Sequence, residues 1–145
     1  MIMSYVDCLQ FGARNVQNFD LLKELGQVRR PILLKRGMAS TLSEFMLAAE
    51  TVLGAGAAEV VLCERGIRSF DPAMRNVLDL NAVPALREMT HLPILIDPSH
   101  ATGLREYVAP MARAATGSLI NRSSSAMSSP SSATSRAPPA ATMSR

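Results

Sequence analysis

Along residues 1–116, hydrophobic and polar positions repeat one pattern four times. Each repeat opens with a short apolar run, continues through a turn rich in Gly, Pro or charged residues, and ends in a longer stretch with apolar residues at helical spacing. The apolar runs are short enough for buried strands and span residues 6–11, 32–34, 60–63 and 92–96. The pattern therefore predicts four strand-helix units.

Local signals mark the ends of the predicted helices. The first helix stops at Gly26, and the second begins at Thr41 with Glu44 at capping-box spacing. The third and fourth helices are indicated by two apolar sets: Val77, Leu80, Val83 and Leu86, then Leu104, Tyr107, Val108, Met111 and Ala115. Pro110 predicts a kink in the fourth helix or its division into two short helices.

Strand-helix repeats of this length predict right-handed crossovers that feed a parallel sheet, which is an α/β fold. Four units fit either a small open sheet or half of an eight-stranded barrel. A complete barrel takes about 250 residues. The chain of 145 residues is therefore at most a part of one.

The composition changes near the C-terminus. Residues 121–145 contain nine Ser, five Ala and three Pro but no Leu, Ile, Val or aromatic residue. So little apolar surface does not offset the ordering cost of about 1–2 kcal/mol per residue. We expect a folded domain over residues 1–116 and a disordered tail over residues 117–145. The net charge of +3 comes from this tail, because residues 1–120 hold twelve basic and twelve acidic residues.

Composition also excludes several classes of protein. A neutral body without interleaved aromatic and basic residues excludes a nucleic-acid-binding protein. No run of 18 or more apolar residues occurs, so no membrane-spanning helix is expected, and the N-terminus lacks the pattern of a secretory signal. Cys8 and Cys63 are too few and too far apart for a disulfide framework or zinc site. We expect reduced thiols, a buried Cys63 and a cytoplasmic protein.

Charged residues follow each predicted strand. In parallel α/β folds, ligands bind where the carboxyl ends of the strands meet. The four strand exits carry Arg14, Lys35, Arg65 and His100. If the strands are neighbours, these side chains converge, and their mutual repulsion calls for an anionic ligand. The sequence therefore predicts a site for a small phosphorylated or carboxylated metabolite.

Each of these residues has a structural alternative. Taken singly, Arg14 or Arg65 is more typical of a surface salt bridge, and His100 of a hydrogen-bonding loop residue. Four hits at four equivalent positions favour a common site. We expect Glu64 to pair with a neighbouring cation.

The strand exits carry four motifs that resemble a known family. The motifs are Gly12-Ala13-Arg14-Asn15, Lys35-Arg36-Gly37, Leu62-Cys63-Glu64-Arg65-Gly66 and Asp97-Pro98-Ser99-His100-Ala101-Thr102-Gly103. In order and spacing they resemble the second half of the type I beta class of 3-deoxy-7-phosphoheptulonate (DAHP) synthase. The first and last motifs favour this family over the related 3-deoxy-octulosonate 8-phosphate synthases, which remain the alternative.

The resemblance implies a partial TIM (β/α)8 barrel with family strands 4 to 7. It implies condensation of phosphoenolpyruvate with erythrose 4-phosphate to DAHP and release of phosphate, the first step of the shikimate pathway. Arg14 and Arg65 would hold the phosphate of phosphoenolpyruvate. Lys35 would contact its carboxylate and the reacting centre, and His100 would bind a divalent metal such as manganese.

This sequence also departs from the family pattern. The family's Gly-Pro-Cys segment, with its metal-binding cysteine, and its Lys-Pro-Arg-Thr substrate loop have no counterpart. The Ser-rich tail stands where the eighth strand carries further metal ligands, and a frameshift is one hypothesis for it. We expect the isolated chain to be inactive and to need a complementing chain or a homo-oligomer. The alternative is a non-catalytic module that binds an anion or docks on a partner.

Overall fold

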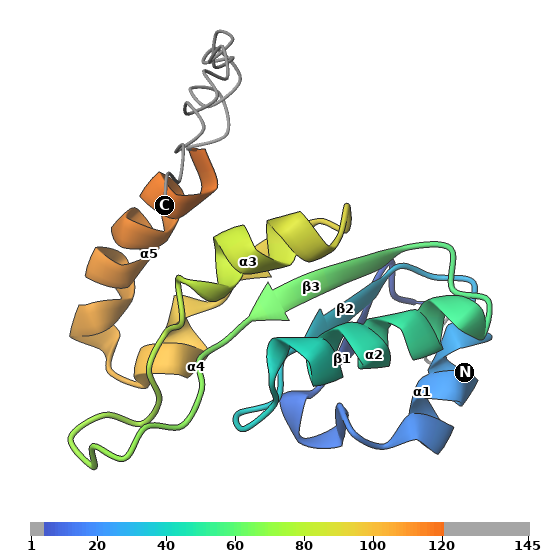
Figure 1. Ribbon diagram of the computed structural model, residues 1–145, viewed down its shortest axis with the longest axis horizontal. Helices are drawn as coiled ribbons and strands as arrows, with labels where there is room; N and C mark the ends of the chain where they lie inside the picture. Colours follow the sequence, from blue (N-terminus) through green and yellow to red (C-terminus); the bar gives the residue numbers. More distant parts are fainter. Residues whose placement is uncertain (1–4, 121–145) are drawn as a thin grey trace, which may run out of the picture.

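Four strands form one parallel sheet in the computed structural model, which describes residues 5–120 (Figure 1). The strands are β1 (Leu9–Phe11), β2 (Ile32–Lys35), β3 (Val60–Glu64) and β4 (Ile94–Ile96). They pair in the order β1-β2-β3-β4, and every pair is parallel. The predicted α/β fold with four strands is confirmed. This sequential order is also the order of strands in the wall of a β/α barrel.

Helices follow the strands as predicted. The long ones are α1 (Phe19–Gly26), α2 (Leu42–Gly54), α3 (Ala82–Met89) and α5 (Arg105–Ile120). Two short elements were not predicted: the 3-10 helix Ala13–Asn15 and α4 (Pro98–Thr102). The capping box at α2 is present, with the Glu44 amide donating to Thr41 Oγ1 at 3.1 Å. Within residues 5–120, no helix has the length and apolar character to span a bilayer.

One helix prediction was wrong in detail, and one of the two alternatives at Pro110 is excluded. Helix α3 begins at Ala82 and not near Val77, because Val77 and Ile67 exchange two backbone hydrogen bonds of 2.9 Å in an isolated bridge. Helix α5 runs unbroken through Pro110, so division into two helices does not occur. Proline removes one backbone hydrogen bond, and the ten following residues of α5 nevertheless continue the helix. The predicted tail starts inside α5, and from residue 121 it lies outside the described residues.

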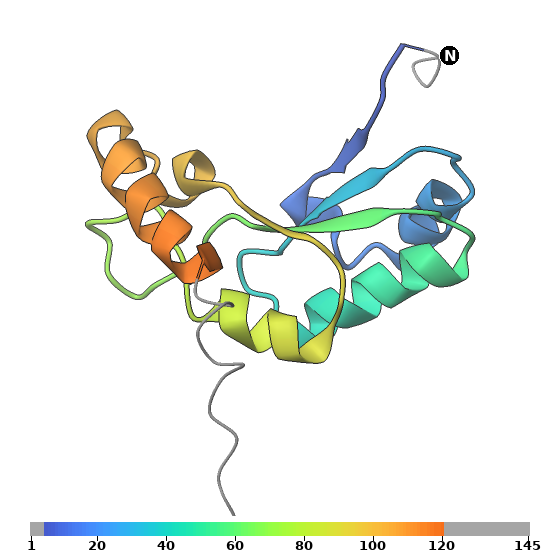
Figure 2. The ribbon, with the colours of Figure 1, turned by 90° about the horizontal axis from the view of Figure 1, so that it is seen from above.

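Helices α1, α2 and α3 cover one face of the sheet, where the hydrophobic core lies (Figure 2). Alternate strand residues point to this face, because successive side chains of a strand lie on opposite sides. The strand and helix residues that form the core include Ile32, Leu34, Val60 and Leu62 from the sheet and Leu22, Phe45, Val52 and Leu86 from the helices. Burial of each such side chain contributes about 1.5–3 kcal/mol to folding.

The opposite face of the sheet has no helix over it within residues 5–120 (Figure 2). The strand register puts Gln10, Leu33 and Val61 in one row on this face and Lys35, Cys63 and Leu95 in the next. Leu95 is 44% exposed. Parallel sheets are normally covered on both faces, so this face has the character of an inner barrel wall.

Gly26 lies where α1 packs closely on α2. A Cβ built at Gly26 would overlap the carbonyl oxygen of Val52 and the Cβ of Ala55. We therefore expect Gly26→Ala to lower the free energy of unfolding by about 1–3 kcal/mol, measured by urea denaturation. Gly54→Ala is the matched control, because no atom lies within 4 Å of a Cβ built there. Equal losses in both variants would contradict this account of the helix contact.

Candidate functional site

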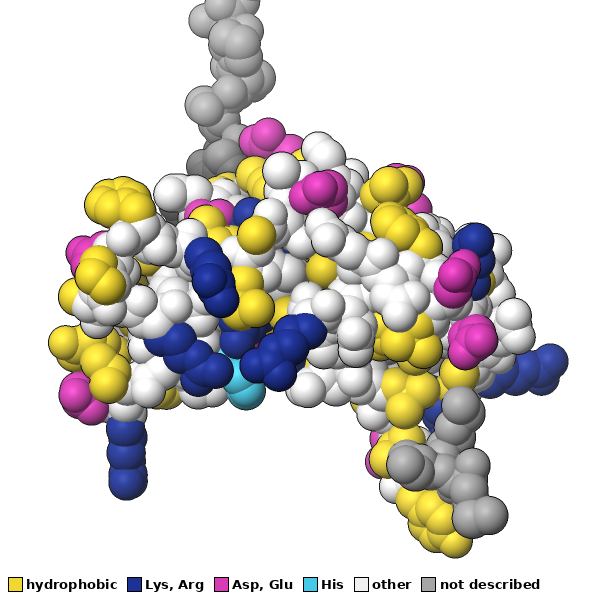
Figure 3. Space-filling view, turned by 90° about the horizontal axis from the view of Figure 1, so that it is seen from below, with side chains coloured by type: hydrophobic (Ala, Val, Ile, Leu, Met, Phe, Trp, Pro, Cys, Tyr) yellow, Lys and Arg dark blue, Asp and Glu magenta, His cyan; other side chains and the backbone are white. Residues whose placement is uncertain are grey.

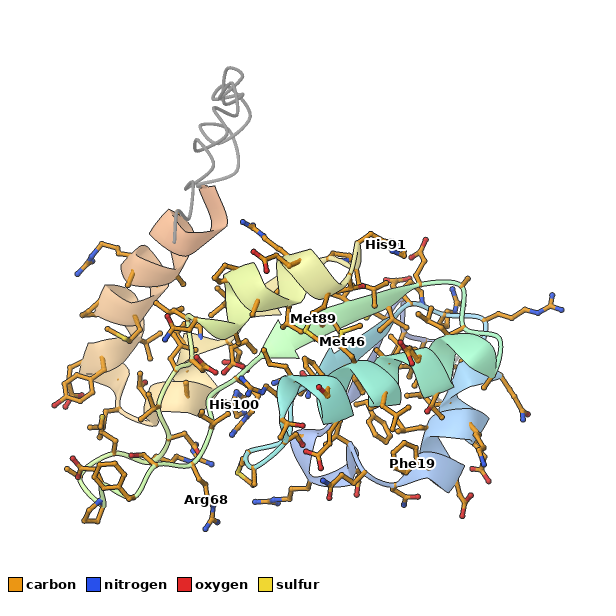
Figure 4. All side chains as sticks on the ribbon, in the orientation of Figure 1. Phe19, Met46, Arg68, Met89, His91 and His100 are labelled. Carbon is orange, nitrogen blue, oxygen red and sulfur yellow. The ribbon has the colours of Figure 1, made fainter. Side chains whose placement is uncertain are left out.

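The carboxyl ends of the strands bring the predicted site residues to one edge. Lys35 ends β2 and Arg65 follows β3, while Arg14 lies in the 3-10 helix after β1 and His100 in α4 after β4. All four line one pocket of about 420 Å³, together with Arg75. Figure 3 shows Lys and Arg side chains gathered around a histidine on this face, and Figure 4 shows His100 at the ends of the strands.

The pocket is strongly cationic. No Asp or Glu is among the residues that line it. Within residues 5–120, Arg14, Arg65 and Arg75 form no salt bridge. Arg65 is only 6% exposed, and its Nη1 has no hydrogen-bond partner among the described residues. A buried donor without a partner costs about 1–3 kcal/mol, so the Arg65 guanidinium has an unused donor that an added acceptor would satisfy.

Asp97 links two of the predicted site residues. Its Oδ2 accepts a hydrogen bond from Lys35 Nζ at 2.8 Å and lies 2.7 Å from His100 Nδ1. Its Oδ1 accepts from the Ser99 hydroxyl at 2.8 Å and the His100 amide at 3.1 Å. Burial alone would raise the pKa of the Asp97 carboxyl, but the hydrogen bonds from Lys35, His100 and Ser99 hold it well below its usual range. Asp97 is therefore a carboxylate that fixes both Lys35 and His100.

A second ionic cluster, formed by Arg36, Glu64 and Asp79, lies at the strand ends on the side of the sheet that the helices cover. Arg36 Nη1 donates to Glu64 at 2.8 Å and to Asp79 at 2.9 Å, and its Nε donates to the Ser40 carbonyl at 3.2 Å. Glu64 is fully buried and also accepts from the Gly66 amide at 2.7 Å. Burial alone would lower the pKa of Arg36, but the hydrogen bonds that it donates to Glu64 and Asp79 raise the pKa above its usual value. The predicted pairing of Glu64 with a neighbouring cation is confirmed.

Strand-exit reasoning missed one residue that lines the pocket, Arg75, and one that holds two pocket residues in place, Asp97. Asp97 belongs to the fourth motif, and Asp before Pro-Ser is a recognisable helix N-cap signal; it does cap α4. Arg75 gave no signal, because it lies in the loop between β3 and α3, where no periodicity places a side chain.

The described residues do not form a complete metal site. The contact between Asp97 and His100 Nδ1 leaves Nε2 as the ring nitrogen available to a metal. No group of three His, Cys, Asp or Glu side chains within residues 5–120 is placed to hold an ion. Since a divalent metal needs several ligands in a fixed geometry, His100 would require ligands from outside this part of the chain.

Comparisons with known proteins agree with this geometry. The model of the DAHP synthetase I family matches residues 1–120. A phospho-2-dehydro-3-deoxyheptonate aldolase from Thermotoga maritima is 52% identical over 114 residues, which cover 79% of this chain and 34% of that protein. A solved truncated form of 3-deoxy-D-arabino-heptulosonate 7-phosphate synthase from Thermotoga maritima superposes with a TM-score of 0.78 at 50% identity. The superposed part covers 81% of this chain and 44% of the solved chain.

A more distant relative is the 2-dehydro-3-deoxyphosphooctonate aldolase of Xylella fastidiosa, which is 28% identical over 126 residues, or 79% of this chain and 44% of that protein. The sequential parallel sheet and the cationic pocket at its carboxyl edge define the chain as a segment of a β/α barrel. The chain belongs to the DAHP synthetase I family and spans about a third of the heptulosonate relative's length.

The Arg36 cluster gives a stability prediction. Arg36→Met removes the cationic partner of the fully buried Glu64, so we expect the free energy of unfolding to fall by about 3–5 kcal/mol. Adding Glu64→Gln should restore part of this loss, because the unpaired charge is gone.

Lys23→Met is the control for the Arg36 prediction. Lys23 and Asp20 form an exposed ion pair of 4.0 Å, so we expect a change below about 0.5 kcal/mol. Urea denaturation measures all three variants, and an Arg36→Met loss as small as that of the control would contradict a structural role for the cluster.

The two cysteines should differ in reactivity. Cys63 is fully buried, and burial raises the pKa of its thiol to about 12, with the Asp97 charge adding to the effect. Cys8 is exposed. Because the thiolate is the reactive form, we expect iodoacetamide at pH 8 to alkylate Cys8 and leave Cys63 unmodified until urea is added. Mass spectrometry of the peptides checks this, and rapid native labelling of Cys63 would disprove it.

Proposed function

We propose that the cationic pocket binds phosphoenolpyruvate. The observation that carries this proposal is the buried Nη1 of Arg65, which has no partner among residues 5–120 and belongs to a pocket without a lining carboxylate. Guanidinium groups match the geometry of phosphate oxygens. Arg14 and Arg65 bind the phosphate, and Lys35 binds the carboxylate next to the reacting centre.

The proposed reaction is that of a DAHP synthase, in which phosphoenolpyruvate condenses with erythrose 4-phosphate and phosphate is released. The chain's contribution to this reaction is to bind and orient. Asp97 holds the Lys35 ammonium at 2.8 Å, so Lys35 reaches the ligand from a fixed position. Cations fixed before the ligand arrives stabilise charge that develops on it without reorganising.

We expect the proposed reaction to require more of the barrel than residues 5–120 supply. The chain spans 34% of the Thermotoga maritima aldolase and 44% of the solved truncated form. The uncovered sheet face and the unpaired outer edges of β1 and β4 are the surfaces where the remaining barrel would join. A complementing chain or a second copy would fill this place. Further ligands for a divalent metal at His100 would come from there as well. The free thiols of Cys8 and Cys63 fit a cytoplasmic protein.

The second candidate is a module that binds the anion without catalysis. The observation that favours it is that residues 10–100 supply the whole lining of the cationic pocket. Anion binding therefore does not require the uncovered sheet face to be closed. The two candidates agree on the ligand and differ in turnover, so the binding experiment comes first.

The binding test uses the full chain and phosphoenolpyruvate in isothermal titration calorimetry. We expect Arg65→Ala and Lys35→Ala each to raise the Kd about tenfold or more, as loss of a charge-assisted hydrogen bond predicts. Arg113→Ala is the control for loss of charge, since Arg113 is exposed on α5 and lies outside the pocket.

Circular dichroism and the Tm of each variant establish that the fold is retained. Absence of binding by the unaltered chain, or equal effects of Arg65→Ala and Arg113→Ala, would overturn the proposed ligand site.

A further inference from the structure

The loop between β3 and α3, residues 65–81, lies at the edge of the molecule (Figure 1). Hydrogen bonds hold it at several points. The Ile67–Val77 bridge closes it with two hydrogen bonds of 2.9 Å, and the Arg68 amide donates to the Met38 carbonyl at 2.8 Å. Asn76 is only 4% exposed, and its Nδ2 donates to the His100 carbonyl at 3.3 Å. The residue before Asn76 therefore has a backbone position fixed against α4.

That residue is Arg75, and its side chain packs against Gly103. Gly103 ends α4 in the left-handed conformation with a φ of +69°. A Cβ built on Gly103 would lie 2.7 Å from Arg75 Cδ and 3.1 Å from Arg75 Cβ. The aliphatic part of Arg75 thus lies directly over Gly103, in space that only a residue without a side chain leaves open. From this position over Gly103, Arg75 lines the same pocket as Arg14 and Arg65.

Arg75 has no counter-charge within residues 5–120. In this it differs from Lys35, which pairs with Asp97, and from Arg36, which pairs with Glu64 and Asp79. A third guanidinium without a partner adds positive charge to the pocket that Arg14 and Arg65 also line, and an anion bound there would offset this charge.

We propose that Arg75 is a further ligand-binding residue of this pocket and that it binds a phosphate oxygen of the ligand. The proposal rests on the proposed phosphoenolpyruvate site and deepens it. Three guanidiniums without a carboxylate partner within residues 5–120 line this pocket, whereas its lysine, Lys35, is already paired with Asp97. The pocket should therefore select a phosphorylated acid over the same acid without its phosphate.

The test compares three probes by isothermal titration calorimetry on the full chain: phosphoenolpyruvate, inorganic phosphate and pyruvate. We expect Arg75→Ala to raise the Kd of phosphoenolpyruvate and of phosphate about tenfold, and Arg75→Lys to cause a smaller loss. Pyruvate should bind weakly to the unaltered chain and no more weakly to Arg75→Ala.

Two further variants separate binding from folding. Gly103→Ala leaves the Arg75 guanidinium chemically intact, but the added methyl group occupies the space of the Arg75 side chain. This variant should therefore weaken phosphate binding as well. Arg68→Ala removes a charge from the same loop, yet Arg68 points away from His100 and does not line this pocket (Figure 4). It should bind like the unaltered chain, and circular dichroism checks that each variant is folded.

The outcomes also separate this proposal from the proposed function. If Arg65→Ala loses binding while Arg75→Ala keeps the original Kd, the Arg75 proposal is overturned and the phosphoenolpyruvate site stands. A loss for pyruvate equal to that for phosphate would overturn it too, because Arg75 would then bind the carboxylate. If the unaltered chain binds neither phosphoenolpyruvate nor phosphate, both proposals fail.

Discussion

The ion pair between Arg36 and Glu64 is the interaction on which the site depends. Successive residues at a strand end point to opposite sides of the sheet, and here each member of the pair adjoins a pocket cation in sequence. Arg36 and Glu64 meet at 2.8 Å on the helix-covered side, while Lys35 and Arg65 line the pocket on the other. Because Glu64 also holds the Gly66 amide, the backbone on both sides of Arg65 is fixed. One buried contact thus sets the positions of two ligand-binding candidates.

Some cations of the pocket have a carboxylate partner and others have none, and this difference leaves the pocket with a net positive charge. Lys35 is neutralised by Asp97 across 62 residues of sequence, which joins the end of β2 to the start of α4. Arg14, Arg65 and Arg75 have no such partner within the described chain. A carboxylate beside each of them would have made a salt-bridge network of the ordinary structural kind. Instead, among residues 5–120, the pocket has one lysine paired with a carboxylate and three arginines without such a partner, and these three are the proposed binding residues.

Sequence reasoning succeeded where the local pattern determines the structure. The four strands, the Thr41–Glu44 capping box and the gathering of Arg14, Lys35, Arg65 and His100 at one edge follow from apolar spacing and from the geometry of parallel sheets. It failed where a distant contact decides. Val77 has helical spacing from Leu80, but pairing with Ile67 keeps it extended. Arg75 reaches the pocket only because Asn76 and Gly103 hold its loop, and neither contact is visible in a periodicity.

The uncovered sheet face affects the proposed binding and the proposed reaction differently. The candidate anion site needs only the carboxyl ends of four neighbouring strands, and these are complete. Catalysis in a closed barrel also needs exclusion of water and ligands from the opposite wall, and Gln10, Leu33 and Val61 face away from the helices without cover among residues 5–120. Charge in water is screened more strongly than in an enclosed site, so the same cations would bind the ligand more weakly here than inside a barrel. The proposed anion binding therefore requires less of a barrel than the proposed reaction does.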